Sequence, residues 1–179
     1  MAATVPNVLF GTFDTPLGVM LVAATARGVC HVAFGDDAEA LEHSVRKEFP
    51  GAVITNDRER VEPWARQVAA GLTPSGAGVE VPLDVHGTPF QHQVWAELRR
   101  IVPGTRRSYQ EVAASIGRPT AVRAVARACA TNPVAVVVPC HRVVRGDGTL
   151  GGFRWGLHRK KALLDAERPL AETSRPRNT

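Results

Sequence analysis

Five consecutive small apolar residues, 134–138, end directly at Pro139 and constrain the fold more than any other segment of this chain. An uninterrupted apolar run of this length is typical of a fully buried strand, and a proline fixes its own backbone angle φ. The sequence therefore predicts a buried strand that ends at Pro139 and holds Cys140 and His141 in a fixed place. A cysteine held beside a histidine is a candidate nucleophile, because thiol reactivity depends on groups that favour the thiolate.

The alternative is that Cys140 is a small buried hydrophobic residue, as most cysteines are. We expect this structural role for the other two cysteines, Cys30 in a strand and Cys129 on the buried side of a helix. Three cysteines without a C-x-x-C pair indicate neither a disulfide framework nor a zinc ribbon. No stretch approaches the roughly 20 apolar residues of a membrane span, and no secretory signal is recognisable. We therefore expect a cytoplasmic protein with free thiols and no membrane partner.

Charge divides the chain into two unlike parts. Residues 1–98 carry 6 basic and 12 acidic side chains, a net charge of −6, whereas residues 99–179 carry 16 and 5, a net charge of +11, which together give the overall +5. The basic part is the part that contains Cys140. Phosphate neutralisation by Lys and Arg drives nucleic-acid binding, so this asymmetry favours a polyanion partner, although a merely solvated basic surface would look the same.

The N-terminal part predicts a small antiparallel sheet covered by two amphipathic helices. Turn residues separate short β-rich runs, and apolar residues then recur with helical spacing. The expected elements are strands over 8–13, 19–24, 28–34 and 79–85, with helices over 36–49 and 58–72. A Pro/Gly/Ser stretch at 73–78 reads as a linker, and we place a domain boundary near residue 86, which gives domains over 1–86 and 87–168.

The C-terminal part predicts mostly helices. Thr88 and Pro89 are a good N-cap and first helical residue for a helix to about residue 100, whose Trp95 lies on the core side. Ser108 caps a short helix that ends at 116, and after the turn 117–119 a second helix, capped by Thr120, covers 121–131. This is helix-turn-helix spacing over 108–132. In the second helix a core-facing stripe opposes two arginines flanked by alanines; the stripe is Val122, Val125, Ala126 and Cys129, and the opposite face is Ala121, Arg123, Ala124, Arg127 and Ala128.

Several segments together resemble the O6-alkylguanine-DNA alkyltransferases, also called methylated-DNA–protein-cysteine methyltransferases. The similarity is continuous over about 82–167 and is closest to the alkyltransferase domain of bacterial adaptive-response proteins. It is carried by Gly87-Thr88-Pro89-Phe90-Gln91, Ser108-Tyr109-Gln110, Val122-Arg123-Ala124-Val125, Asn132-Pro133, Pro139-Cys140-His141-Arg142-Val143 and Gly152-Phe153-Arg154-Trp155-Gly156. The resemblance implies an α+β fold with an N-terminal RNase H-like region and a helical C-terminal domain that carries a DNA-binding helix-turn-helix.

The resemblance also implies a reaction. The alkyl group of O6-alkylguanine in double-stranded DNA, and less readily that of O4-alkylthymine, passes irreversibly to Cys140, without a cofactor and once per protein molecule. His141 activates the cysteine through a water, Glu167 orients His141, and Asn132 fixes the turn before the cysteine. Glu167 lies four residues after Leu163, so a C-terminal helix would turn both inward; a surface carboxylate is the alternative.

Further residues are implied to present the base. A methylated base is inaccessible inside a duplex and has to be rotated out of the stack. Arg123 would fill the vacated space through the minor groove, and Tyr109 would rotate the nucleotide and donate a hydrogen bond to guanine N3. The carbonyls of Cys140 and Val143 would accept the guanine amino group. The remaining candidate contacts to DNA or base are Ala121, Ala124, Arg127, Gly151 and Arg154.

At two places this chain departs from the family pattern, and there the family's properties do not carry over to it directly. Arg154 stands where some members have a small hydroxyl residue, so we expect slower reaction with bulky adducts such as benzylguanine than with methyl adducts. The zinc ligands of some vertebrate members are not recognisable around Cys30 and His31, and we predict no metal. We expect a monomer with a disordered tail over 169–179. The sequence leaves open cooperative DNA binding and membership of a longer regulator.

Two other functions compete with alkyl transfer. A binding module that flips damaged bases without chemistry would not need Cys140. A thiol hydrolase would use Cys140, His141 and Glu167 as a triad, but adjacent residues of one strand point to opposite faces, which is a poor arrangement for direct proton transfer.

Overall fold

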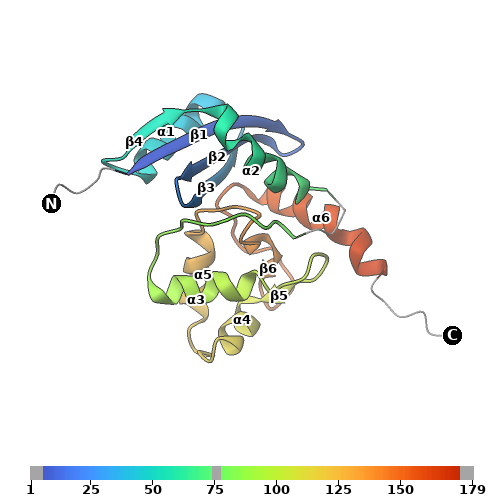
Figure 1. Cartoon of the computed structure of the whole chain (residues 1–179). Coiled ribbons are helices and arrows are strands. Elements are labelled where there is room, and N and C mark those ends of the chain that lie inside the picture. The colour runs from blue at the N-terminus through green and yellow to red at the C-terminus, as the bar shows by residue number, and fades with distance from the viewer. Residues whose placement is uncertain (1–5, 74–77, 174–179) are drawn as a thin grey trace.

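The computed structural model describes residues 6–73 and 78–173. Figure 1 shows a sheet with two helices in the N-terminal half and a group of helices in the C-terminal half, with α6 where the halves meet. Within the described residues no helix is long and apolar enough to cross a membrane.

The N-terminal sheet has four strands in the order β3-β2-β1-β4. Strands β1 (Asn7–Thr15), β2 (Gly18–Thr25) and β3 (Gly28–Gly35) pair antiparallel, as predicted, and β4 (Val53–Asn56) pairs parallel to β1. The expectation of a purely antiparallel sheet was therefore wrong. Four mostly exposed residues carry no alternating apolar pattern, so β4 gave no signal in the sequence.

Both predicted helices of this half are present. Helix α1 (Ala38–Glu48) packs against β2 and β3, and α2 (Arg58–Ala70) packs against β1 and β2. Each begins after an aspartate whose carboxylate accepts a backbone N–H of the first turn, Asp37 in α1 and Asp57 in α2. Local apolar spacing and capping thus sufficed to place them.

The strand predicted over 79–85 is absent. This segment contributes one isolated bridge, between Leu83 and Val29 of β3, with backbone hydrogen bonds from Val29 N to Pro82 O at 2.8 Å and from Asp84 N to Val29 O at 2.9 Å. Pro82 has no N–H to donate, and this interrupts a longer ladder.

The C-terminal half is mostly helical, as predicted. Its elements are α3 (Pro89–Leu98), β5 (Arg107–Ser108), α4 (Tyr109–Ser115), α5 (Val122–Ala130), the 3₁₀ turn η1 (Cys140–Arg142), β6 (Val143–Val144) and α6 (Leu157–Thr173). Thr88 and Ser108 each form a capping box, with Gln91 and Glu111. Thr120 does not cap α5, whose N-cap is Ala121 without a side-chain bond. Helix α6 also covers 169–173, which we had assigned to a tail; 174–179 lie outside the described residues.

Helix α5 presents the two faces that its sequence indicates, with one exception. Val125 and Cys129 are buried, whereas Arg123, Ala124 and Arg127 are exposed. Ala128, expected beside the arginines, is buried, because α5 packs against α3. At this contact Trp95 Nε1 of α3 donates to the backbone carbonyl of Ala128 at 2.9 Å. This contact confirms the structural role expected of Trp95.

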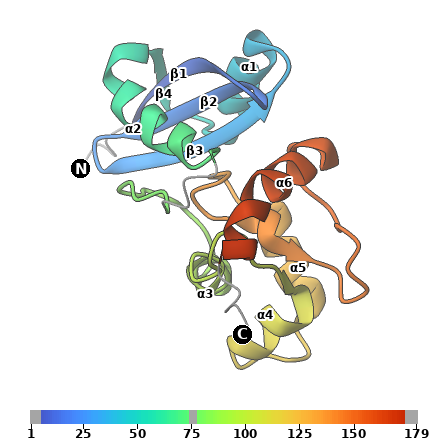
Figure 2. The same ribbon diagram turned by 90° about the vertical axis from the view of Figure 1, so that its right-hand side faces the viewer.

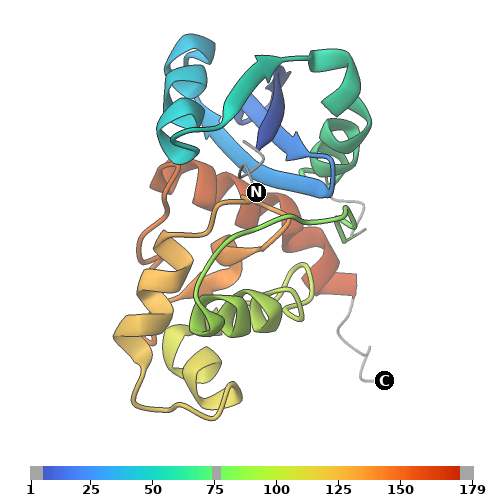
Figure 3. The same ribbon diagram turned by 60° about the vertical axis from the view of Figure 1, so that its left-hand side comes forward.

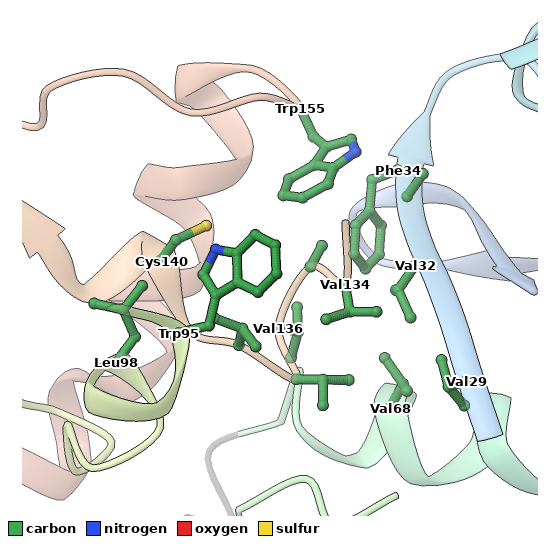
Figure 4. Packing of buried hydrophobic residues seen from close by; sticks show 14 of the residues in the cluster. Val29, Val32, Phe34, Val68, Trp95, Leu98, Val134, Val136, Cys140 and Trp155 are labelled. Carbon is green, nitrogen blue, oxygen red and sulfur yellow. The ribbon is translucent and has the colours of Figure 1, made fainter. Parts of the chain in front are cut away.

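One continuous cluster of buried apolar side chains runs through both halves. Strand β3 is the strand nearest to the C-terminal half, and α6 lies beside it (Figures 2 and 3). Figure 4 shows Val32 and Phe34 of β3 facing Val134 and Trp155. The seam between the halves is therefore part of the core.

The apolar run 134–138 is buried but is not a strand, which corrects our first prediction. It folds into a tight turn in which Val137 N donates to Ala135 O at 2.8 Å and Val138 N donates to Val134 O at 3.1 Å. Val136 has a φ of 70°, in the left-handed region that a β-branched residue rarely occupies. Such strain persists only where surrounding contacts impose it, and here the turn precedes Cys140.

Candidate active site

Cys140 is the first residue of the turn η1, and it is 4% exposed. Burial raises the pKa of its thiol above the ordinary value, while a hydrogen bond from Asn132 and the positive charge of Lys160 act in the opposite direction. The Asn132 amide nitrogen Nδ2 donates to Cys140 Sγ at 3.2 Å. The thiol is thus held as a neutral group by burial, with two neighbours that favour its thiolate.

Asn132 is completely buried, and its side chain holds both ends of the valine-rich turn. Nδ2 also donates to the carbonyl of Val138 at 2.8 Å, and Oδ1 accepts from Val134 N at 3.0 Å. These bonds satisfy backbone groups that a strand would pair with a neighbouring strand. The amide of Asn132 therefore stabilises this turn and the position of Cys140 that follows it.

His141 is paired with Glu167 of α6. His141 Nε2 lies 2.9 Å from Glu167 Oε1, and Arg142 Nη2 donates to the same oxygen at 2.8 Å. Burial alone would raise the pKa of Glu167, but the bonds from His141 and Arg142 lower it to about 2. Burial lowers the pKa of His141, and its Nδ1 has no hydrogen-bond partner among the described residues. When the ring of His141 is neutral and Nε2 is hydrogen-bonded to the carboxylate of Glu167, Nδ1 is therefore free to accept a proton.

Tyr109 begins α4 and lies against the loop that precedes α6. A Cβ added to Gly151 would lie 2.7 Å from the Tyr109 hydroxyl oxygen, and Gly151 has a φ of 71°. Both facts require glycine at 151. Burial raises the pKa of Tyr109 to about 12, so that its hydroxyl remains protonated at neutral pH.

Lys160 is a buried residue that sequence reasoning missed. Its ammonium Nζ donates to Val143 O at 2.6 Å and to Gly152 O at 3.1 Å, which joins β6 to the loop before α6. Burial lowers its pKa to about 8. The signal was available, since Lys160 lies seven residues before Glu167 and therefore on the same face of the helix.

Arg154 lies at the seam between the halves. Its Nη1 donates to Asn132 O at 3.3 Å and its Nη2 donates to Glu48 Oε2 at 2.9 Å. The site thus brings together Cys140, His141, Glu167, Asn132 and Arg154, with Val143 linked through the lysine. The candidates at the DNA-binding helix lie outside this buried cluster: Ala121 is the N-cap of α5, and Arg123, Ala124 and Arg127 are exposed on it.

No group of three or more His, Cys, Asp or Glu side chains within the described residues has the arrangement of a metal site. Cys30 and Cys129 are buried, and burial raises the thiol pKa of both, that of Cys30 to about 12. Among the residues that the structure describes, no side-chain amide donates to either thiol as Asn132 does to Cys140.

Comparison with known proteins identifies the relatives of this chain. The model of the 6-O-methylguanine DNA methyltransferase DNA-binding domain matches residues 89–169. The bifunctional transcriptional activator/DNA repair enzyme Ada of Escherichia coli is 46% identical over 160 residues, which are 89% of this chain and 45% of Ada. The chain therefore spans about half the length of Ada, as it does of the Salmonella typhimurium regulatory protein ada, of which it covers 46%.

Other relatives are matched over most of their length. The crystal structure of Mycobacterium tuberculosis OGT in complex with DNA has a TM-score of 0.77 and 33% identity, over 91% of this chain and 94% of that chain. The inducible methylated-DNA–protein-cysteine methyltransferase of Bacillus subtilis is 38% identical over 148 residues, 82% of this chain and 83% of the relative. The chain therefore belongs to the methylated-DNA–protein-cysteine methyltransferase family.

Proposed function

We propose that this protein repairs DNA by transferring the alkyl group of O6-alkylguanine to Cys140, irreversibly and once per molecule. The observation that carries the proposal is the buried Cys140 thiol, which accepts a hydrogen bond from Asn132 and directly precedes a histidine paired with a carboxylate. A nucleophile, a base and a group that orients the base are the parts that nucleophilic catalysis requires.

In the proposed step the thiol proton of Cys140 passes through a water to Nδ1 of His141. The sulfur then forms a bond to the alkyl carbon as the bond from that carbon to O6 breaks, and the electron pair leaves with the guanine. A proton returned to the departing nucleobase restores neutral guanine. Glu167 remains ionised because its pKa is about 2, and it stabilises the imidazolium that forms. The product is a thioether at Cys140, which none of these residues can reverse.

The protonated hydroxyl of Tyr109 would assist the departure of guanine by donating a hydrogen bond to N3. The carbonyls of Cys140 and Val143 would accept the guanine amino group. Lys160 already donates to Val143 O at 2.6 Å, but a carbonyl oxygen has two lone pairs and accepts a second donor. Gly151, against Tyr109, would keep that side of the base pocket open.

Helices α4 and α5 would act as a helix-turn-helix that places α5 in the minor groove. Arg123, exposed on α5, would fill the space left by the flipped base, and Arg127 would contact the backbone. The small residues Ala121 and Ala124 would allow close approach to the groove. The net charge of +11 over residues 99–179 supports this interface, as does the solved complex of Mycobacterium tuberculosis OGT with DNA. The N-terminal half would be an RNase H-like region that packs on this DNA-binding half.

The test is the mass of the protein after incubation with DNA that contains O6-methylguanine. We expect one methyl mass on the peptide that contains Cys140, loss of transfer in Cys140→Ala, and unchanged transfer in Cys129→Ala and Cys30→Ala. Methylation at another cysteine would refute the assignment. Ester turnover without DNA would instead support a thiol hydrolase, and lesion binding without methylation would support a binding module.

A second assay addresses the adduct. Competition between O6-methylguanine and O6-benzylguanine should favour the methyl adduct, because the long Arg154 side chain stands where a small residue would leave more room. Equal rates would contradict this preference.

A further inference from the structure

A single guanidinium joins the N-terminal half to the residue that contacts the nucleophile. Arg154 Nη2 donates to Glu48, the last residue of α1, at 2.9 Å, while Nη1 of the same group donates to the Asn132 carbonyl at 3.3 Å. Glu48 and Arg154 are 106 residues apart in the sequence. The planar fork of arginine fixes the direction of one bond when the other is made.

Asn132 connects this contact to Cys140. Its carbonyl accepts from Arg154, and its side-chain Nδ2 donates to Cys140 Sγ at 3.2 Å. The guanidinium also lies over the ring of the buried Trp155, 5.7 Å from the centroid. Glu48, Arg154, Asn132 and Cys140 thus form a continuous chain of contacts.

The neighbour that could compete for Glu48 is His31 of β3. Its ring is buried and has no hydrogen-bond partner within the described residues. Burial lowers the pKa of His31 to about 4, so the ring is neutral at pH 7. Glu48 therefore pairs with Arg154 and not with a charged His31.

We infer that Glu48 is a positioning residue for alkyl transfer: through Arg154 it fixes the backbone of Asn132 and hence the amide that donates to Cys140 Sγ. This rests on the proposed function, because its consequence is the rate of transfer. The N-terminal half would then contribute to reactivity and not only to packing. Coupling carried by such contacts is changed by substitutions along them.

The pair is suited to a positioning role because it contributes little to stability. The side chains of Arg154 and Glu48 are 28% and 31% exposed, and ion pairs that remain in contact with solvent are weak. Glu48→Gln should therefore fold with an almost unchanged melting temperature. Glu42→Gln removes the same charge from the same helix and is the matched control.

The kinetic test separates DNA binding from transfer in single-turnover reactions with O6-methylguanine DNA. In Glu48→Gln we expect transfer from the saturated complex to be about 3- to 30-fold slower, with DNA affinity as in Glu42→Gln. Wild-type transfer in Glu48→Gln would overturn the inference.

A charge swap distinguishes positioning from stability. Glu48→Arg combined with Arg154→Glu restores an ion pair between α1 and the loop, but a glutamate at 154 has no donor for the Asn132 carbonyl. We expect the melting temperature to stay close to that of the wild type and the transfer rate to stay low. A wild-type transfer rate in this double variant would overturn the inference.

A third measurement needs no alkylated DNA. The pH dependence of iodoacetamide modification, read by mass spectrometry on the Cys140 peptide, reports how well the thiolate is stabilised. The charged and titratable groups that act on Cys140 are Lys160 of α6, Cys129 of α5, Tyr109 of α4 and Arg154. We expect the midpoint to move to higher pH in Glu48→Gln and not in Glu42→Gln.

An unchanged midpoint in Glu48→Gln would overturn the positioning role. The same measurement separates the two proposals. If the wild-type protein takes no methyl group from DNA, the proposed function fails, while a shifted midpoint in Glu48→Gln would still support the link from Glu48 to Cys140.

Discussion

His31 in the N-terminal half and His141 in the C-terminal half are each 1% exposed, but only His141 has a hydrogen-bond partner within the described residues. His141 Nε2 is held by Glu167 at 2.9 Å. His31 packs edge-on against Phe49, with ring centroids 6.1 Å apart. Burial of a histidine does not by itself indicate chemistry; a carboxylate that fixes the ring does.

The same contrast extends to the other buried polar side chains. Among the described residues these are His31, Asn132, His141, Arg159, Lys160 and Glu167. All except His31 lie in the C-terminal half and have hydrogen-bond partners. An unpartnered polar group costs free energy, whereas a partnered network rigidifies its surroundings. Asn132, His141, Lys160 and Glu167 therefore fix the site, whereas Arg159 donates to Leu17 and Asp36 and joins α6 to the N-terminal half.

The largest effect is expected when the general base, His141, is removed. His141→Ala should slow methyl transfer by about 100-fold or more, because general base catalysis contributes at least that much. His31→Ala should change the rate from a saturated DNA complex less than about twofold, since His31 holds no reacting group. Single-turnover kinetics would measure both. Similar losses of transfer rate in the two variants would show that burial of a histidine, and not its pairing with Glu167, determines its effect on the rate.

The next effect is on stability at acid pH. The pKa of His31 is about 4 in the folded protein, against 6.5 for the ordinary group. As the pH falls, the unfolded chain therefore binds a proton at His31 before the folded protein does. The contribution of His31 to the free energy of unfolding is fully present above pH 6.5 and is lost as the pH falls to about 4. The loss should reach about 3 kcal/mol.

His31→Leu should remove this part of the pH dependence, as measured by urea unfolding from pH 7 to pH 4. The lowered pKa of His141 adds loss of the same sign, so the difference between the wild type and His31→Leu isolates His31. The exposed His43→Gln is the control. Parallel stability profiles in wild type and His31→Leu would contradict the prediction.

Lys160 tests whether a partnered cation stabilises the site. Lys160→Met keeps the stem but leaves the carbonyls of Val143 and Gly152 without this donor, which should cost about 2 kcal/mol of the free energy of unfolding. Lys161→Met, on the adjacent exposed position, should cost less than about 0.5 kcal/mol. Chemical denaturation would measure both, and equal losses would show that the buried bonds contribute nothing beyond the charge.

The smallest effect concerns the group that orients the base. Glu167→Gln keeps the size of the side chain but loses the charge that stabilises protonated His141. We expect transfer to be slower than in the wild type, with a smaller loss than in His141→Ala and with DNA affinity unchanged. A wild-type rate would mean that Arg142 and the surrounding core are enough to orient His141.

Helices were more predictable than strands in this chain. Helices α1, α2 and α3 follow from apolar residues at helical spacing and from local caps, both of which lie within a few residues of each other. Strand β4 was missed, and the strands expected over 79–85 and 134–138 do not form. A strand depends on a partner that is distant in sequence, and apolar spacing does not identify that partner.

The turn before the nucleophile shows this limit clearly. Five apolar residues are buried, as their composition requires. Only the start of the run pairs with β3, through the bridge between Val134 and Val32, and the side chain of Asn132 then binds backbone groups of Val134 and Val138 where the run turns. The resemblance to the alkyltransferases pointed to Asn132 as the residue that fixes this turn. Its direct bond to Cys140 Sγ had no signal in the sequence.

The sequence by itself determined most of the apolar residues of the core, where most helices begin and end, which half is basic, and which cysteine is followed by a histidine. These properties depend on composition and on neighbours along the chain. Only the tertiary structure decided that Glu167 reaches His141 from 26 residues away, that Lys160 joins β6 to the loop before α6, and that Glu48 reaches Arg154 across the seam. Hydrogen bonds and ion pairs act over about 3 Å, and the packing of the whole chain sets which distant groups come that close.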